Sequence, residues 1–318
     1  MKTRPFGRTG LQVRPIGLGG FPFGGVNRAA DWDPFTPEGR RTAIATIHRA
    51  LERGITYLDT APSYGDGNSE SIVGEALAGR RASVILATKC PGNADAAAVL
   101  RSLEASLRRL RTDYVDVLQL HGGMFSAEDV RHILEQGPLD GLRQAREQGK
   151  VRFIGFTAEE PWTARPLIAS GGFDVVQLRY NLIYQSAALH ALNEARDAGL
   201  GVAVMRPLTS GILQRILRFL KPQWPSEDVY AVALQFVLSD SRVHVANVGM
   251  RWPAEVDRNV DLVEAFTPPT DFADLPRLTA GIYRVEDQEA GLSSRAVNVK
   301  SAEPQPPRIN STRTLEDQ

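Results

Sequence analysis

Cysteine is almost missing from this sequence of 318 residues, in which Cys90 is the one example. A single cysteine excludes an intrachain disulfide framework and any zinc site built from several thiolates. The chain also lacks a run of about 18 apolar residues that could span a membrane, and its N-terminal segment lacks the continuous apolar core of a signal peptide. Its 37 basic residues balance 37 acidic ones, so no net charge attracts nucleic acid or an anionic membrane. These absences predict a cytoplasmic enzyme that acts on a small molecule, with a binding protein as the alternative.

Short β-rich runs are abundant instead, and they alternate with helical patterns along the chain. Most of these runs are continuously apolar, which is typical of parallel strands covered on both faces. Eight such runs begin at Pro15, Gly54, Ser83, Tyr114, Val151, Phe173, Gly199 and Val243. Eight strand-helix units predict an α/β fold, a (β/α)8 TIM barrel spanning residues 1–266. The rival is an open doubly wound sheet, but the early glycines Gly17, Gly19 and Gly20 lack the G-x-G-x-x-G spacing with which such a sheet usually begins.

The two ends of the chain differ from its repeating middle. Before Pro15, the letters GRTG separate two short extended pieces, which predicts a β-hairpin that plugs the N-terminal end of the barrel. Beyond Phe266 the composition shifts to proline, serine and charged residues. We therefore expect residues 267–318 to form a C-terminal extension, either a partly disordered tail or a flap across the barrel mouth.

Catalytic groups of a TIM barrel lie at the C-terminal ends of its strands, so the side chains expected there are informative. The predicted strands end at Gly20, Asp59, Lys89, His121, Thr157, Gln177, Arg206 and Gly249. This set offers neither the facing carboxylates of a glycosidase nor the His and Asp ligands of a metal-dependent hydrolase, and we expect no metal site. Three successive strands instead supply a carboxylate, an ammonium and an imidazole, and Tyr64 follows the first of these three strands.

This arrangement of side chains points to the phenol of Tyr64. An ammonium at Lys89 would stabilise the phenolate and lower the pKa of the phenol, while Asp59 would hold the charge of a buried Lys89. His121, as a neutral imidazole, would bind a substrate oxygen. The four residues predict a proton-transfer site for a carbonyl or an alcohol, with Tyr64 as the general acid and base.

These residues and their spacing resemble the aldo-keto reductase superfamily. The similarity covers about residues 3 to 265 and includes LDTAPSYGDGNSESIVGEAL from Leu58, ATKC from Ala87, DYVDVLQLHG from Asp113, GKVRFIGFT from Gly149, VVQLRYNLI from Val175, RPLTSGIL from Arg206 and VGMRWPAEVDRNV from Val248. The resemblance implies a barrel that binds a nicotinamide cofactor without a Rossmann domain. It also implies a catalytic tetrad that protonates a carbonyl oxygen through its tyrosine during hydride transfer, and here the tetrad is Asp59, Tyr64, Lys89 and His121.

The same resemblance implies a set of cofactor-binding positions, in which the RPLTSGIL segment wraps the pyrophosphate. Gln177 matches a glutamine that binds the nicotinamide carboxamide, but the usual Ser-Asn pair beside it is replaced by Thr157 and Ala158. Arg251 matches the segment that reads the 2′-phosphate of NADP, the expected cofactor. Glu255 places a carboxylate where many relatives have Gln or Arg, so NAD stays the alternative. The full expected set is Gly20, Asp59, Thr157, Gln177, Arg206, Pro207, Leu208, Ser210, Gly211, Leu213, Gly249, Arg251, Glu255 and Asn259.

Aromatic and sulfur-containing side chains on the loops predict the walls of a substrate site. Trp32 lies in a loop between AAD and DPF, where we expect a ligand contact rather than burial. Such walls suit an apolar carbonyl compound. The expected substrate contacts are Phe21, Trp32, His121, Met124 and Phe125.

The leading hypothesis is therefore an NAD(P)-dependent oxidoreductase that reduces small aldehydes or ketones, as a monomer or a weak homo-oligomer. Two alternatives stay open. One is a dehydrogenase that oxidises a sugar or an alcohol with NAD. The other is a slow-turnover regulatory subunit that senses NADPH, which would bind the cofactor tightly but turn it over weakly.

Overall fold

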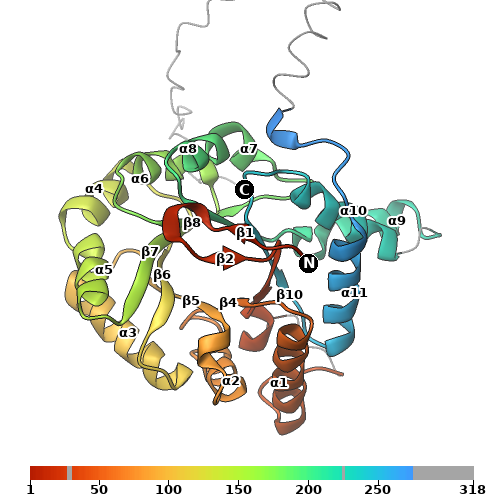
Figure 1. The fold of residues 1–318 in the computed structure, drawn as a ribbon, viewed down its shortest axis with the longest axis horizontal. Coiled ribbons are helices and arrows are strands. Elements are labelled where there is room, and N and C mark those ends of the chain that lie inside the picture. The colour runs from red at the N-terminus through yellow and green to blue at the C-terminus, as the bar shows by residue number, and fades with distance from the viewer. Residues whose placement is uncertain (27–30, 224–225, 275–318) are drawn as a thin grey trace, which may run out of the picture. The chain divides into compact units, whose positions relative to one another are not determined.

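Eight parallel strands form a closed barrel in the computed structural model, which describes residues 1–26, 31–223 and 226–274 (Figure 1). The barrel strands are β3 (Ile16–Gly19), β4 (Tyr57–Asp59), β5 (Ile85–Pro91), β6 (Val115–His121), β7 (Val151–Ala158), β8 (Val175–Arg179), β9 (Gly201–Met205) and β10 (Val245–Gly249). They follow this order around the ring, and β10 pairs with β3 to close it. The predicted (β/α)8 TIM barrel is confirmed.

The burial of the strands explains why their sequences are continuously apolar. All four residues of β3 are buried, as are the first six residues of both β5 and β6. One face of each strand points into the barrel and the other packs against helices, so neither face can be polar without a partner. The few polar side chains that these strands do carry therefore mark positions with a special role.

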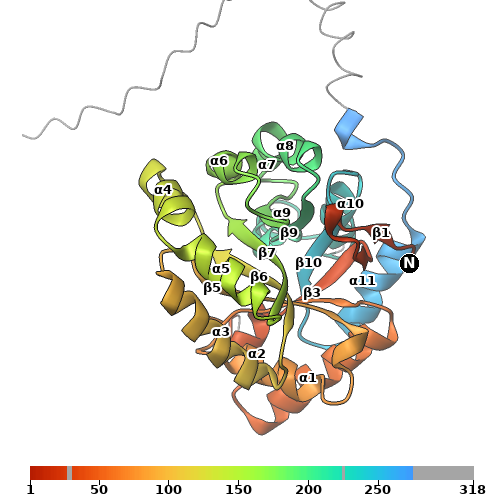
Figure 2. The ribbon, with the colours of Figure 1, turned by 60° about the vertical axis from the view of Figure 1, so that its left-hand side comes forward.

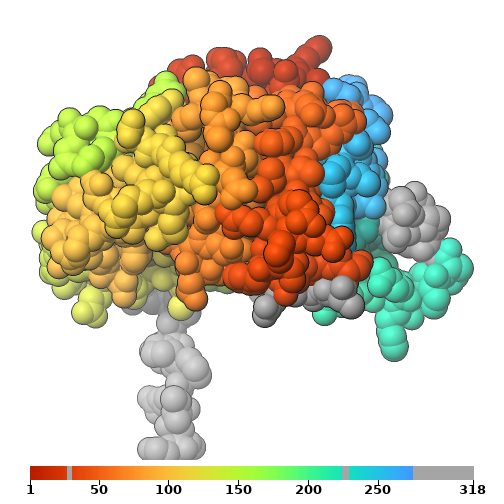
Figure 3. Space-filling model, turned by 90° about the horizontal axis from the view of Figure 1, so that it is seen from below, coloured from red at the N-terminus to blue at the C-terminus, as the bar shows by residue number. Residues whose placement is uncertain are grey.

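Helices surround the barrel (Figure 2). The first begins as its sequence suggests, because Thr36 Oγ1 accepts a hydrogen bond from the N–H of Gly39 and Pro37 is its first residue. The helices are α1 (Pro37–Glu52), α2 (Asn68–Ala76), α3 (Ala96–Leu110), α4 (Ala127–Glu135), α5 (Pro138–Glu147), α6 (Arg165–Ala169), α7 (Ser186–His190), α8 (Leu192–Asp197), α9 (Ile212–Leu220), α10 (Ser226–Leu238) and α11 (Pro253–Ala265). Helix α9 stands out from the body, in the teal part of Figure 3. Within the three ranges described, no helix is both long and apolar enough to cross a membrane.

The N-terminal hairpin closes one end of the barrel, as predicted. Strands β1 (Arg4–Pro5) and β2 (Gln12–Val13) pair in antiparallel fashion and lie across the ring in Figure 1. Phe6, between them, is fully buried in a cluster that includes Tyr57 and Val175, near the starts of their strands. The hairpin therefore seals the N-terminal end and leaves the opposite end for ligands.

The barrel and its helices form a compact unit that spans Met1–Ala273. After α11 the chain returns to α10: the N–H of Phe272 donates to the carbonyl of Ser239 at 2.7 Å, and its ring lies 5.1 Å from that of Phe236. The predicted C-terminal extension begins at residue 267, and its part from residue 275 onward lies outside the described residues. Whether it is a tail or a flap therefore stays a prediction.

Candidate active site

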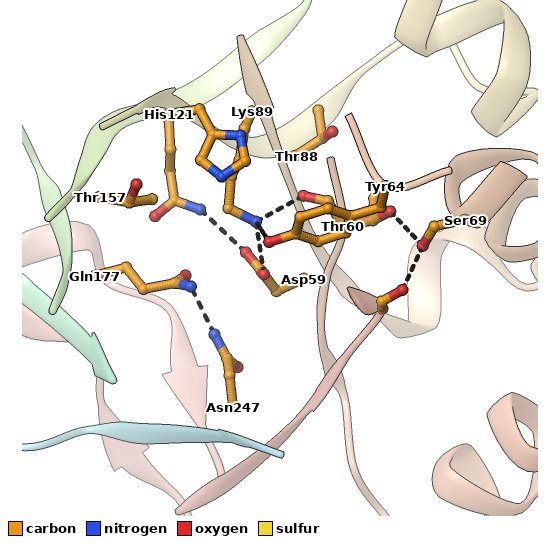
Figure 4. Close-up of polar contacts among 12 residues, drawn as sticks. Asp59, Thr60, Tyr64, Ser69, Thr88, Lys89, His121, Thr157, Gln177 and Asn247 are labelled. Carbon is orange, nitrogen blue, oxygen red and sulfur yellow. Dashed lines mark hydrogen bonds and ion pairs between the residues drawn. The ribbon is translucent and has the colours of Figure 1, made fainter. Parts of the chain in front are cut away.

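Four side chains that the sequence places at neighbouring strand ends lie together in the structure (Figure 4). Asp59 is the last residue of β4, and Tyr64 lies in the loop that follows it. Lys89 lies in β5, and His121 ends β6. The ammonium of Lys89 donates to Asp59 Oδ2 at 2.7 Å and to the phenol oxygen of Tyr64 at 3.0 Å. One ammonium thus connects a carboxylate with a phenol.

The ion pair between Asp59 and Lys89 is buried, with 4% and 1% of the two side chains exposed. Burial by itself lowers the pKa of Lys89, but the neighbouring Asp59 carboxylate and Tyr64 raise it above its ordinary value. Lys89 therefore keeps its proton at neutral pH. The second oxygen of Asp59 accepts a hydrogen bond from Gln119 Nε2 at 3.2 Å, which helps to satisfy a largely buried carboxylate.

The pKa of Tyr64 corrects one expectation. We expected Lys89 to lower it, but burial raises the pKa of Tyr64 above its ordinary value, and Lys89 offsets this only in part. The negative charges of Asp59 and Glu159 raise it further. Lys89 does lower the pKa of Tyr64 as expected, but the net direction is the opposite, because the expectation omitted desolvation. Tyr64 is consequently a protonated phenol at neutral pH, the form that can donate a proton.

His121 is a neutral imidazole that faces the open cavity. Burial of the ring by surrounding protein, together with the positive charge of Lys89, lowers the pKa of His121 to about 4. Its Nδ1 lies 3.3 Å from Ser63 Oγ, and its ring meets the ring of Tyr64 edge to face at 5.8 Å. The expectation of a neutral imidazole beside the phenol is confirmed.

A cavity of about 650 Å³ opens at the C-terminal ends of the strands and includes all four of these side chains. Its volume falls in the range typical of sites for cofactors and small ligands. Most of the residues expected to bind the cofactor line it: Asp59, Thr157, Gln177, Arg206, Pro207, Leu208, Ser210, Gly211, Gly249, Arg251, Glu255 and Asn259. Within the described chain no three His, Cys, Asp or Glu side chains are grouped as metal ligands would be.

Two of the expected cofactor residues do not line the cavity. Gly20 instead supports Asp59, because its N–H donates to the Asp59 carbonyl at 2.6 Å. A Cβ at residue 20 would lie 2.6 Å from Ser69 Oγ, so only glycine permits this approach. Leu213 is the second residue of α9, and its N–H donates to Thr209 Oγ1 at 3.1 Å. Both residues support the backbone of the cavity walls without lining the cavity.

Of the residues expected to contact the substrate, some line the cavity and others do not. Phe21 lines the cavity, and its ring meets that of Tyr64 at 5.0 Å. Trp32 does not: it is 2% exposed and packs against Trp252 at 6.3 Å, so the expected ligand contact is wrong. Phe125 is also buried, against Phe156, and Met124 is exposed outside the cavity walls. The rings of Trp32 and Phe125 therefore pack in the core instead of contacting a ligand.

Sequence reasoning missed several polar residues of the cavity. Asn247 on β10 donates to Gln177 Oε1 at 3.2 Å, and its own Oδ1 is buried without a protein partner in the described chain. A polar residue within the apolar run VHVANVGM was the signal for it. Glu159 was also missed, because its partner is Arg206 on a different strand end, 2.6 Å away. Also lining the cavity are Ser63, Arg215, Tyr230 and Arg258.

The ion pair of Glu159 and Arg206 holds a strained segment against the cavity. Arg206, Thr209 and Ser210 have φ values of 59°, 58° and 53°, the left-handed region that side chains other than glycine rarely adopt. Two nitrogens of the Arg206 guanidinium contact the Glu159 carboxylate, and a third donates to Ser210 Oγ at 3.1 Å. Surrounding contacts of this kind are what keep such backbone in place.

Comparison with known proteins agrees with this geometry. A model of the Aldo/keto reductase family matches residues 15–223. L-galactose dehydrogenase of Arabidopsis thaliana is 29% identical over 302 residues, which cover 83% of this chain and 88% of that protein. The NADH-specific methylglyoxal reductase of Escherichia coli is 30% identical over 233 residues, or 67% of this chain and 69% of that protein.

Solved structures extend the likeness to the whole barrel. The aldo/keto reductase of Klebsiella pneumoniae, in complex with NADP and acetate, superposes with a TM-score of 0.68 at 25% identity, over 87% of this chain and 95% of its own. Fold, strand-end chemistry and sequence similarity all agree. The chain belongs to the aldo/keto reductase family and is an NAD(P)-dependent oxidoreductase that reduces carbonyls or oxidises alcohols.

Proposed function

We propose that this enzyme reduces small aldehydes or ketones with Tyr64 as the proton donor, and that NADP is its cofactor. The observation that carries the catalytic part is the placement of Lys89 between Asp59 and Tyr64, at 2.7 Å and 3.0 Å. A carboxylate that keeps a buried ammonium charged beside a phenol has little structural use, because an apolar core would be as stable there. The arrangement suits a phenol that must lose and regain a proton.

The chain's own residues then have distinct tasks. When bound, a reduced nicotinamide supplies the hydride that the carbonyl carbon accepts. Tyr64 donates its proton to the carbonyl oxygen, and Lys89 stabilises the phenolate that is left behind. His121 is neutral and can donate one N–H to the same oxygen, which orients the carbonyl before transfer. In the oxidising direction the same groups act in reverse, with Tyr64 accepting the alcohol proton.

The polar lining of the cavity fits a nicotinamide cofactor. Asn247 and Asn259 both line the cavity, and the Oδ1 of each is buried without a protein partner in the described ranges, so both side chains are suited to a polar ligand. Gln177 and Asn247 together would bind the carboxamide, with Asn247 supplying the contact that Ala158 cannot make. The segment after β9 would hold the pyrophosphate.

NADP is proposed over NAD because guanidinium groups gather at the far end of the cavity, where Arg251 and Arg258 both line it. The Klebsiella pneumoniae relative was solved with NADP. The carboxylate of Glu255 and the NADH-specific relative from Escherichia coli are the reasons to test NAD beside it.

A second candidate is the oxidation of a sugar or another polyhydroxy alcohol. Of the apolar side chains expected in the walls, Phe21 lines the cavity but Trp32, Met124 and Phe125 do not, and the polar residues Ser63, Glu159 and Arg206 line it as well. Hydroxyl, carboxylate and guanidinium groups can bind several substrate hydroxyls, which an apolar carbonyl compound lacks. The similarity to L-galactose dehydrogenase points in the same direction.

A screen of aldehydes, ketones, sugars and polyols with NADPH, NADH and their oxidised forms tests the proposal, with nicotinamide absorbance as the readout.

Tyr64→Phe should bind the cofactor as the wild type does and lose at least about 10²-fold in turnover. Tyr57→Phe is a matched control, because its hydroxyl is buried on β4 without a partner in the described chain and touches no ligand site. Full activity in Tyr64→Phe would refute the assigned role. Tight NADPH binding without turnover of any substrate would favour the sensing subunit instead.

A further inference from the structure

We propose that Arg258, rather than Arg251, binds the 2′-phosphate of NADP and gives the enzyme its preference between the two cofactors. The inference rests on the proposed use of NADP. It concerns the end of the cavity formed by α10 and α11, where Tyr230, Arg251, Glu255 and Arg258 meet.

Arg251, the candidate named by the sequence, is already engaged. Glu255 Oε2 accepts the backbone N–H of Arg251 at 2.6 Å, and Glu255 Oε1 lies 3.6 Å from the Arg251 guanidinium. The guanidinium also lies over the ring of Trp252, 4.2 Å from its centre. A phosphate that approached Arg251 would meet the Glu255 carboxylate at the same place, and two anions repel each other there.

Arg258 has the opposite surroundings. It lies on α11, three residues after Glu255, and lines the same cavity, but no carboxylate pairs with it in the part of the chain that the structure describes. Its Nε is buried and has no hydrogen-bond partner among those residues. Its guanidinium lies 5.2 Å from the centre of the Tyr230 ring, which also lines the cavity. A buried donor without an acceptor is unfavourable, and a bound anion would supply the acceptor.

The charges of the whole cavity support this assignment. Four arginines of the described chain line it, and two of them have carboxylate partners: Arg206 with Glu159 and Arg251 with Glu255. Arg215 and Arg258 have none among the described residues. Arg215 lies on α9, directly after the segment proposed to hold the pyrophosphate, whereas Arg258 lies on α11 beside Asn259. NADP carries two separate anionic groups, and the cavity offers one unpaired guanidinium near each expected position.

Titration of the wild type and of Arg258→Gln with NADPH and NADH, followed by intrinsic fluorescence or calorimetry, tests the proposal without any need for a substrate. The wild type should bind NADPH more tightly than NADH. Arg258→Gln should weaken NADPH binding at least tenfold and change NADH binding less than twofold. Arg258→Lys should retain part of the preference, because an ammonium keeps the charge but not the planar fork.

Two further variants make the result specific. Arg49→Gln removes the same charge beside α11, where Arg49 pairs with Asp257 at 2.8 Å outside the cavity, and it should leave the ratio of the two affinities unchanged. Arg251→Gln should reduce the ratio less than Arg258→Gln does. A wild type that binds both dinucleotides equally, or an Arg258→Gln variant that keeps the preference, would overturn this inference alone. A wild type that binds neither would overturn the proposed function as well.

Discussion

Burial and charge compete at two residues of the active site, and the outcome differs between them. For Lys89, desolvation is the largest single effect, but Asp59 and Tyr64 together outweigh it, so the ammonium keeps its proton. For Tyr64, desolvation outweighs the attraction of Lys89, so the phenol keeps its proton as well. Both groups are therefore protonated at neutral pH, and the proton of Tyr64 is available to a carbonyl oxygen. An account based on the shortest distance alone would have reversed the second result.

The pH profile of carbonyl reduction checks this balance. Because burial raises the pKa of Tyr64 above its usual value of about 10, kcat/KM should stay level through neutral and mildly alkaline pH. On the acid side it should change only as His121, with a pKa of about 4, becomes protonated. Lys89→Met should move the alkaline limb to still higher pH, since Lys89 is the group that lowers the pKa of Tyr64. An alkaline limb that shifts downward in the variant would contradict the account.

The sequence could name the catalytic residues because their placement depends on local information. Each lies at or just beyond the end of an apolar run, and the barrel brings those ends together. The ion pairs of the cavity could not be predicted in this way. Glu159 and Arg206 are 47 residues apart, and the absence of an ion pair for Arg258 among the described residues depends on how two helices pack. Trp32 was misplaced for the same reason, because its partner Trp252 is remote in the sequence.

The sequence predicted the barrel strands, but it did not predict how every helix packs around them. Burial on both faces makes a barrel strand continuously apolar, and that pattern survives in a single sequence. Helix α9 has the reverse property: Ile212, Ile216 and Phe219 are exposed, and Phe219 has 84% of its surface accessible. Its amphipathic pattern therefore does not indicate a face against the barrel, and the sequence predicted only a cofactor loop there.

The N-terminal hairpin should contribute to stability and not to catalysis. Phe6 is fully buried among side chains at the N-terminal ends of the strands, away from Tyr64. Phe6→Ala should lower the free energy of unfolding by roughly 3–5 kcal/mol through loss of burial and formation of a cavity. The folded variant should keep its KM. Thermal unfolding and steady-state kinetics measure the two effects.

Phe219→Ala is the matched control for that change, because it removes the same ring from an exposed position on α9. Its unfolding free energy should stay within about 0.5 kcal/mol of the wild type. Equal destabilisation by both substitutions would show that the hairpin is not part of the barrel's core.

At the scale of the whole molecule, stability and chemistry occupy opposite ends of one barrel. The hairpin fills the N-terminal end with apolar side chains, and the C-terminal end holds the charged and polar groups of the cavity. The chain has no net charge, yet its cavity contains guanidinium groups without carboxylate partners in the described residues, so anion binding is a local property. Composition alone could not show this, because it averages over the surface and the site.

The compact unit ends at Ala273, beyond the end of α11. Its contacts extend past α11: Phe272 packs on Phe236, and Asp271 Oδ1 accepts the N–H of Ser241 at 2.9 Å. A chain ending at Ala273 keeps these contacts and should unfold within about 1 kcal/mol of the full-length protein, whereas a chain ending at Phe266 should lose roughly 1–3 kcal/mol. Thermal unfolding compares the three proteins. If the chain ending at Ala273 binds NADPH and turns over as the full-length protein does, the remaining residues are a tail; a change in either quantity would show that they form part of the site.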